Sequence, residues 1–180
     1  MDAGGEMIVG LDPGFANFGV VTAWNLRGGL VFDRGAVIKT RPCKDLSKAE
    51  DLISRSDSLA QDLAWFVEQG RPPDVFAVCC EGFSRPPHAG TAIKLGAANG
   101  IVGALCSRWT PNVISVETPS NIRKRIFGAK RTPPEADVHA WLIELYRELG
   151  PILEDYCKGD RLHILDAAAA VVAAFKQGRL

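Results

Sequence analysis

The sequence predicts an α/β fold in which a mixed five-stranded sheet carries helices on both faces. Two observations support this prediction. Three strand-like runs come first with only short turns between them, which is typical of antiparallel strands. Strand-like and helix-like segments then alternate, and connections that contain a helix are long enough to join parallel strands. We expect one domain over residues 1–180, because a chain of this length can bury a substantial core.

The antiparallel part of the sheet is expected from three runs near the N-terminus. The run 7–12 is apolar up to Asp12, after which a Pro-Gly pair ends the strand. A second run over 18–24 follows at once, and the glycine-rich turn 27–29 connects it to a third run over 30–39. This order places Asp12 at the end of a central strand. Asp-Pro-Gly is also a common turn sequence, so Asp12 taken alone has an ordinary structural explanation.

The next segments predict a helix and a buried strand. Ser47 and Glu50 form a capping-box pattern that opens a helix, and Pro72-Pro73 follows its end. The run 75–80 is wholly apolar, which is typical of a strand covered on both faces. Glu81 comes directly at the C-terminal end of this strand, as Asp12 does for the first.

Helix boundaries in the second half of the chain rest on capping patterns. Thr91 and Thr132 are expected N-caps, and Glu135 completes a capping box with Thr132. Gly150-Pro151 is expected to stop the helix that Thr132 caps. The expected elements are a helix at 91–108, a strand at 113–116, and helices at 120–127, 132–149 and 160–176.

Composition limits the class of protein. The chain is 47% hydrophobic and 23% charged, as soluble globular proteins are. Residues 1–6 lack the basic start of a secretory signal, and no apolar run is expected to span a membrane. Five cysteines without a CxxC pair favour a reducing compartment and argue against a zinc site. We therefore expect a cytoplasmic protein.

The net charge is zero, but the charges are unevenly distributed. No acidic residue occurs in 118–134, whereas acidic residues are concentrated in 135–160. This separation predicts one basic face on a neutral protein, although a mixed solvated surface is the simpler explanation. The basic residues of the segment are Arg123, Lys124, Arg125, Lys130 and Arg131.

Four polar side chains occupy otherwise apolar settings. His163 and Asp166 are three residues apart on the last helix and so share a face. A buried carboxylate without a partner costs about several kcal/mol, so Asp166 needs a hydrogen-bonding partner or a divalent cation. Asp12 and Glu81 end strands that we expect to be neighbours, and ligands converge at such strand ends. Carboxylates with one imidazole suit Mg²⁺ or Mn²⁺ better than Zn²⁺.

The motifs around these residues resemble those of the RuvC family of Holliday-junction resolvases, which have an RNase H-like fold. The resemblance covers nearly the whole chain. Its most specific part is the block Lys94-Leu95-Gly96, which lies at the same distance from Glu81 as in the family. The terminal motif begins at His163 and resembles the variant of the family motif in which histidine replaces the first acidic residue. The segments are 8–20, Glu81 with 91–100, 118–128 and 163–168.

The resemblance implies a homodimer that binds four-way DNA junctions and nicks two strands of like polarity. It implies two-metal hydrolysis, with Mg²⁺ or substituting Mn²⁺, in which Asp12 bridges the ions. Glu81 would complete one metal site, and His163 with Asp166 the other. The implied location is cytoplasmic on the nucleoid, or the host cytoplasm for a viral gene. The expected DNA contacts are Phe83, Arg85, Lys94, Arg123, Lys124, Arg125, Lys130 and Arg131.

Two departures from the family pattern predict an altered cut-site preference. Phe83 lies one residue nearer the glutamate than in the family, so it either stacks on a junction base or only anchors its loop. Pro133-Pro134 occupies the place of a lysine that the family often has, and Lys130 or Arg131 is expected to substitute.

Three alternative functions stay open from the sequence. The opening Gly-x-Asp-x-Gly also occurs in actin-like ATPases and sugar kinases, but those proteins need a second related domain. A non-catalytic junction-binding protein is a different class, and four retained metal-ligand residues argue against it. A relaxed nuclease that also cuts forks and flaps is the nearest rival, and no helicase partner is identified.

Overall fold

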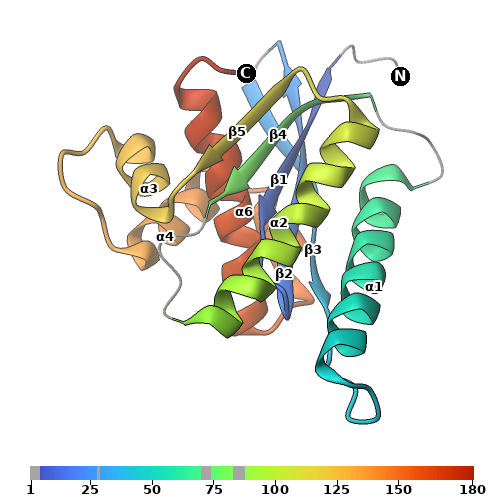
Figure 1. The fold of residues 1–180 in the computed structure, drawn as a ribbon. Helices are drawn as coiled ribbons and strands as arrows, with labels where there is room; N and C mark the ends of the chain where they lie inside the picture. Colours follow the sequence, from blue (N-terminus) through green and yellow to red (C-terminus); the bar gives the residue numbers. More distant parts are fainter. Residues whose placement is uncertain (1–4, 28, 70–73, 83–87) are drawn as a thin grey trace.

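The computed structural model describes residues 5–27, 29–69, 74–82 and 88–180. At its centre is a five-stranded sheet with the strand order β3-β2-β1-β4-β5 (Figure 1). β1 pairs antiparallel with β2 and parallel with β4, and β5 continues the parallel part. The mixed sheet expected from the sequence is confirmed. Its strands are β1 (Glu6–Asp12), β2 (Asn17–Leu26), β3 (Gly29–Lys39), β4 (Val75–Glu81) and β5 (Val113–Glu117).

Helices cover both faces of this sheet (Figure 1), as predicted. The helices α1 and α2 lie on one face, whereas α6 lies on the other together with α3, α4 and α5. Side chains along β1 alternate between the two layers, because successive residues of a strand point to opposite faces. Ile8 packs in the α6 layer, and Val9 and Leu11 pack in the α1–α2 layer. The helices are α1 (Lys48–Glu68), α2 (Ala89–Trp109), α3 (Pro119–Phe127), α4 (Glu135–Leu145), α5 (Leu149–Glu154) and α6 (Lys158–Lys176).

Helix α6 lies unusually close to the sheet. Its residues 167–174 are all buried, and most of them are alanines, whose small side chains permit this approach. Two glycines on the strands are required as well. A Cβ at Gly10 would clash with the carbonyl oxygen of Ala167, and a Cβ at Gly19 with that of His163. The close packing brings the first turns of α6 to the strand end that carries Asp12.

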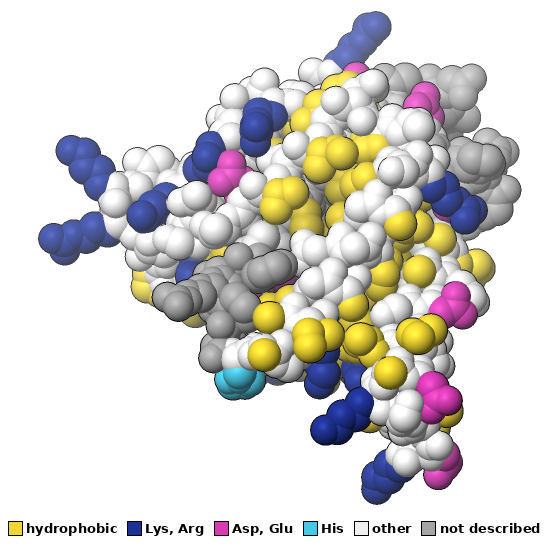
Figure 2. Space-filling view, viewed as in Figure 1, with side chains coloured by type: hydrophobic (Ala, Val, Ile, Leu, Met, Phe, Trp, Pro, Cys, Tyr) yellow, Lys and Arg dark blue, Asp and Glu magenta, His cyan; other side chains and the backbone are white. Residues whose placement is uncertain are grey.

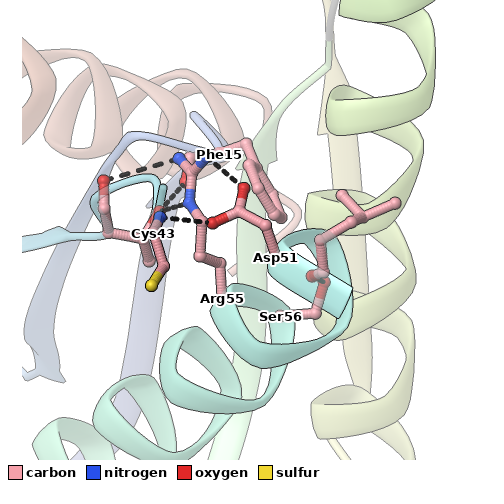
Figure 3. Close-up of polar contacts among 7 residues, drawn as sticks. Phe15, Cys43, Asp51, Arg55 and Ser56 are labelled. Carbon is pink, nitrogen blue, oxygen red and sulfur yellow. Dashed lines mark hydrogen bonds and ion pairs between the residues drawn. The ribbon is translucent and has the colours of Figure 1, made fainter. Parts of the chain in front are cut away.

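Arg55 of α1 braces the turn that follows Asp12 (Figure 3). Its guanidinium lies over the ring of Phe15, 4.6 Å from the ring centroid, and its Nε donates to Thr40 Oγ1 at 3.0 Å. It also forms an ion pair with Asp51 at 3.5 Å. Thr40 in turn donates to the Phe15 carbonyl at 2.6 Å. Because its donors are satisfied, Arg55 can be buried and can hold this turn from the helix side.

Helix starts agree with the prediction at α1 but differ at α2 and α4. The capping box of Ser47 and Glu50 at α1 is confirmed. Helix α2 begins two residues before Thr91, after His88 as its N-cap. Thr132 does not cap α4, because its hydroxyl bonds with that of Ser120 at 2.9 Å. Helix α4 therefore begins only at Glu135.

Gly150-Pro151 does not stop a helix, contrary to the prediction. Helix α4 already ends at Leu145, because Tyr146 leaves the helical conformation and packs edge-on against Phe32 with the ring centroids 5.2 Å apart. The short α5 begins afterwards at Leu149 and has Gly150-Pro151 in its first turn. Proline fits there because the N–H groups of a first turn have no partner within the helix.

Helix α2 is long and apolar enough to cross a membrane when only length and composition are counted. The expectation that no segment has this property is therefore wrong. The reason is that the helix carries only two charged residues, Lys94 and Arg108. Because core helices of globular proteins pass the same test, this is weak evidence for a membrane. In the structure, Ala98, Val102 and Leu105 are buried in the layer between α2 and the sheet, but only 28% of the apolar window of this helix is buried.

Candidate active site

A histidine and an aspartate meet at the carboxyl end of β1. Nδ1 of His163, on α6, lies 2.7 Å from Oδ2 of Asp12. This contact raises the pKa of the His163 imidazole above its ordinary value. Burial raises the pKa of Asp12, although the hydrogen bond with His163 opposes that effect. The structure thus brings two of the four predicted metal ligands into direct contact.

A second histidine, which the sequence analysis missed, contacts Asp166. Nε2 of His139, on α4, lies 2.8 Å from Oδ1 of Asp166. Glu135 lies one turn before His139, and the ligand atoms of these three residues all lie within 4.8 Å of one another. The signal in the sequence was the spacing of four residues, which places Glu135 and His139 on one face of a helix.

Glu81 stands beside Asp12 at the same edge of the sheet. Leu11 and Cys80 are partners in the parallel pairing of β1 with β4, so the residues that follow them end neighbouring strands. Burial, together with the negative charges of Asp166, Asp12 and Glu135, raises the pKa of Glu81 to about 8. The carboxylates therefore repel one another, and this repulsion favours a bound cation or a bound proton.

The donor set at this edge fits a divalent cation. Asp12 and His163 are in contact, and Glu81 ends the neighbouring strand. Among the described residues, however, Asp166 groups within 4.8 Å with Glu135 and His139 and not with the other predicted ligands. Oxygen-rich sets with few nitrogens bind Mg²⁺ or Mn²⁺. A small cavity of about 20 Å³ adjoins Glu81 and Asp166. The four residues of the set are Asp12, Glu81, His163 and Asp166.

The basic segment lies next to this site, on and after α3. Arg125 forms an ion pair with Glu117 at 2.9 Å, and Arg123 lies 3.7 Å from Glu135. Two of the six described cations that were expected to contact DNA thus have carboxylate partners within the protein. The other described cations of the expected set are at least partly exposed, namely Lys94, Lys124, Lys130 and Arg131.

The loop after Glu81 is only partly described. Phe83 and Arg85 lie outside the described residues, so their DNA contacts stay predictions. The description resumes at His88, the N-cap of α2.

Comparison with known proteins identifies the family. No protein-family model matches the chain. A crossover junction endodeoxyribonuclease RuvC from Nitratidesulfovibrio vulgaris is 32% identical over 129 residues, which cover 71% of this chain and 70% of that protein. The chain belongs to the RuvC family. The resemblance in its motifs is thereby confirmed.

Solved structures of resolvases share the fold of this RuvC-family chain. RuvC of Thermus thermophilus, in complex with a Holliday junction substrate, matches 96% of this chain and 95% of its own with a TM-score of 0.71 at 17% identity. The yeast mitochondrial Holliday junction resolvase Ydc2 has a TM-score of 0.58 at 10% identity, over 96% and 86% of the two chains. The fowlpox virus resolvase with Holliday junction DNA has 0.56 at 15% identity, over 97% and 99%. These matches confirm the predicted RNase H-like fold.

Proposed function

We propose that this protein is a metal-dependent endodeoxyribonuclease that resolves four-way DNA junctions by paired, symmetric nicks. The observation that supports this function is the contact of Asp12 with His163, next to the strand that ends at Glu81, in a member of the RuvC family. The Nitratidesulfovibrio vulgaris relative is a crossover junction endodeoxyribonuclease, and the Thermus thermophilus structure holds a Holliday junction substrate.

The chain's own residues hold the metal site and its protons. The side chains of Asp12, Glu81, His163 and Asp166 would hold two Mg²⁺ ions, or Mn²⁺ in their place. When bound, such ions activate a water for attack on the phosphodiester and stabilise the leaving 3′ oxygen, which yields 5′-phosphate and 3′-hydroxyl ends. Because the pKa of Glu81 is about 8, this carboxyl holds a proton at neutral pH that it must release to act as a ligand.

Basic side chains next to the site would bind the DNA backbone. Lys124, Lys130 and Arg131 are at least partly exposed on and after α3, and cations that neutralise phosphates supply much of the affinity of a DNA-binding protein. Arg123 and Arg125 would contribute less, because carboxylates of the protein already engage them. Further proposed DNA contacts are Lys94, Phe83 and Arg85.

An apolar face on α2 and β5 would bind a second copy of the chain (Figure 2). Ile93, Ile114 and Val116 are each more than half exposed, and a groove of about 370 Å³ runs between the helix and the edge strand. Added Cβ atoms at Gly100 and Gly103 would meet nothing within 4 Å, so another backbone can approach closely there. We propose that a second copy, and not a membrane, covers this face, because symmetric cutting of two strands needs two active centres.

The dimer is tested by light scattering after size-exclusion chromatography. Gly100→Glu would place a charge in the proposed interface and is expected to give a monomer. Gly159→Glu is the matched control, because its Cβ also meets nothing within 4 Å and it lies on α6, away from the face. A monomeric wild type, or a Gly100→Glu dimer as tight as the wild type, would contradict this interface.

The remaining proposals concern organisation and location. We propose that residues 1–180 act as one nuclease domain, since the matched Thermus thermophilus chain is covered over 95% of its length. We further propose that the protein works in the cytoplasm on nucleoid DNA, or in the host cytoplasm if the gene is viral.

The nuclease function is tested with a labelled synthetic four-way junction, and linear duplex and a Y-fork serve as controls. Cleavage is measured in Mg²⁺, in Mn²⁺ and in EDTA. We expect paired nicks on the junction in either metal and none in EDTA. Equal cutting of the fork would contradict junction selectivity, and tight binding without cutting in either metal would overturn the catalytic role.

A further inference from the structure

Helix α4 places two additional ligand groups beside Asp166. Glu135 and His139 are one turn apart on this helix and face α6 together, with their ligand atoms within 4.8 Å of an Asp166 oxygen. None of the motifs that identify the family contains either residue. Their position therefore calls for an explanation specific to this chain.

The separation of the donor atoms fits a shared ion. In an octahedral site with metal–ligand distances near 2.1 Å, two adjacent ligand atoms are roughly 3 Å apart. His139 Nε2 and Asp166 Oδ1 are 2.8 Å apart because they share a hydrogen bond, and a bound ion would take the place of the proton between them. The three donors come from two helices that pack on each other, so the arrangement does not depend on a loop.

A cavity of suitable size lies among these groups. It has a volume of about 20 Å³, and its polar lining consists of Glu81, Glu135, His139 and Asp166 together with one cation, Arg123. That volume holds about one water-sized body. The His139 side chain is 7% exposed and lies inside, whereas that of Glu135 is 51% exposed. An ion in the cavity would thus have a buried nitrogen ligand and a carboxylate that can be reached from solvent.

The protein itself neutralises this cluster only weakly. Arg123 is the cation beside it, and its Nη1 stands 3.7 Å from Glu135, which is a loose contact. Its Nε is buried and has no hydrogen-bond partner among the described residues. Glu135 is therefore free to turn toward an ion without breaking a strong ion pair.

We propose that Glu135 and His139 bind a divalent cation together with Asp166, and that the imidazole makes this subsite prefer Mn²⁺ to Mg²⁺. The preference follows from ligand chemistry, because imidazole nitrogen suits transition metals whereas Mg²⁺ prefers oxygen ligands and water. This inference rests on the proposed function in one respect, namely that a cation binds at Asp166. It deepens that function by naming two further ligands.

The test measures Mn²⁺ binding directly, without DNA. Untagged, metal-free protein is titrated with Mn²⁺, and free Mn²⁺ is read by electron paramagnetic resonance. Pulsed measurements on the bound ion detect ¹⁴N of a coordinated imidazole. The chain has three histidines, namely His88, His139 and His163, so each nitrogen signal can be assigned by substitution.

We expect His139→Gln to weaken Mn²⁺ binding at one site by roughly tenfold or more, with a smaller change for Mg²⁺. Its ¹⁴N signal should fall to that of His163 alone, and His139→Gln with His163→Gln should remove it. His88→Gln is the matched control, because His88 is exposed at the N-cap of α2, and it should leave both readouts unchanged.

A second substitution guards against failure to fold. Glu135 is largely exposed, so Glu135→Gln removes a proposed ligand without disturbing the core, and it should also weaken Mn²⁺ binding. Glu144→Gln removes the same charge from an exposed position of the same helix and should have no effect.

Unchanged Mn²⁺ affinity in both His139→Gln and Glu135→Gln would overturn the inference. Weaker binding with an unchanged ¹⁴N signal would overturn it too, because His139 would then only orient Asp166. Failure of the proposed function would give a different result. If His139→Gln removes a ¹⁴N signal from bound Mn²⁺ while the wild-type protein cuts no junction, the subsite is supported and the nuclease function is contradicted.

Discussion

The two histidine–aspartate pairs of the site share their chemistry but differ in their surroundings. The His163–Asp12 pair joins α6 to the end of β1, and its histidine side chain is 31% exposed. The His139–Asp166 pair joins α4 to α6, and its histidine is almost completely buried. We call the first the exposed pair and the second the buried pair after their histidines, because the two aspartates do not differ in this way: the Asp166 side chain is 23% exposed and that of Asp12 is 17% exposed. Substitutions in the two pairs should therefore have different consequences.

The largest effect is expected at the exposed pair. Asp12→Asn removes a carboxylate of the proposed metal site and should lower the single-turnover cleavage rate by at least about 10³-fold. Junction binding, measured by fluorescence anisotropy in EDTA, should stay near the wild-type value. Asp62→Asn, at an exposed position of α1, is the control. Near-normal turnover of Asp12→Asn would remove Asp12 from the site.

The contrast between the pairs is sharpened by exchanging each histidine for glutamine. His163→Gln should lower cleavage by roughly 100-fold in Mg²⁺ and in Mn²⁺ alike. His139→Gln should lower it by roughly 10-fold in Mn²⁺ and by less in Mg²⁺. The measurement is the cleavage rate over a titration of each metal. Equal losses for both variants in Mg²⁺ would show that the pairs do not differ in the way proposed.

The pH dependence of stability tests the carboxylate beside both pairs. The pKa of Glu81 is raised from 4.5 to about 8 and that of His163 is also raised, so the native state holds protons that the unfolded chain releases. The free energy of unfolding of the metal-free protein should therefore fall as the pH rises from about 4.5 to above 8. Glu81→Gln should raise it by several kcal/mol near pH 8.5, since one pKa unit corresponds to about 1.4 kcal/mol, and leave it little changed at acidic pH.

Urea unfolding in EDTA at several pH values measures this effect. Glu144→Gln, on the exposed side of α4, is the control and should keep the wild-type pH dependence. If Glu81→Gln shows the same slope as the wild type, then Glu81 does not hold a proton in the native state.

The smallest effect concerns DNA contacts. A basic side chain that already forms an ion pair within the protein should contribute less to phosphate binding. Lys124→Ala with Arg131→Ala should weaken junction binding and reduce the slope of log affinity against log salt by about 1.8. Arg125→Ala should change the slope less, because Glu117 engages Arg125. Equal slopes for the double variant and the wild type would place the DNA elsewhere.

The sequence was sufficient to predict the features that depend on local chemistry. The strand end at Asp12 follows from an apolar run and a Pro-Gly turn, and the shared face of His163 and Asp166 follows from helical spacing. Asp12 and Glu81 end adjacent strands as expected, because β1 and β4 are parallel neighbours.

The features that depend on docking between helices could not be predicted in this way. His139 lies 27 residues before Asp166, and their contact exists only because α4 packs against α6. Glu135 was interpreted as part of a capping box, which hid its position on the helix face. Thr132 bonds with Ser120 instead, a tertiary contact that no capping pattern reveals.

The most direct test of paired, metal-dependent cutting uses a supercoiled plasmid that extrudes a cruciform. Two nicks made within one binding event give linear DNA, whereas single nicks give open circles. We expect mainly linear product with ends that ligase can seal, in Mg²⁺ or Mn²⁺, and none in EDTA or with Asp12→Asn. Open circles alone, or linear product that persists in EDTA, would contradict a metal-dependent dimeric resolvase.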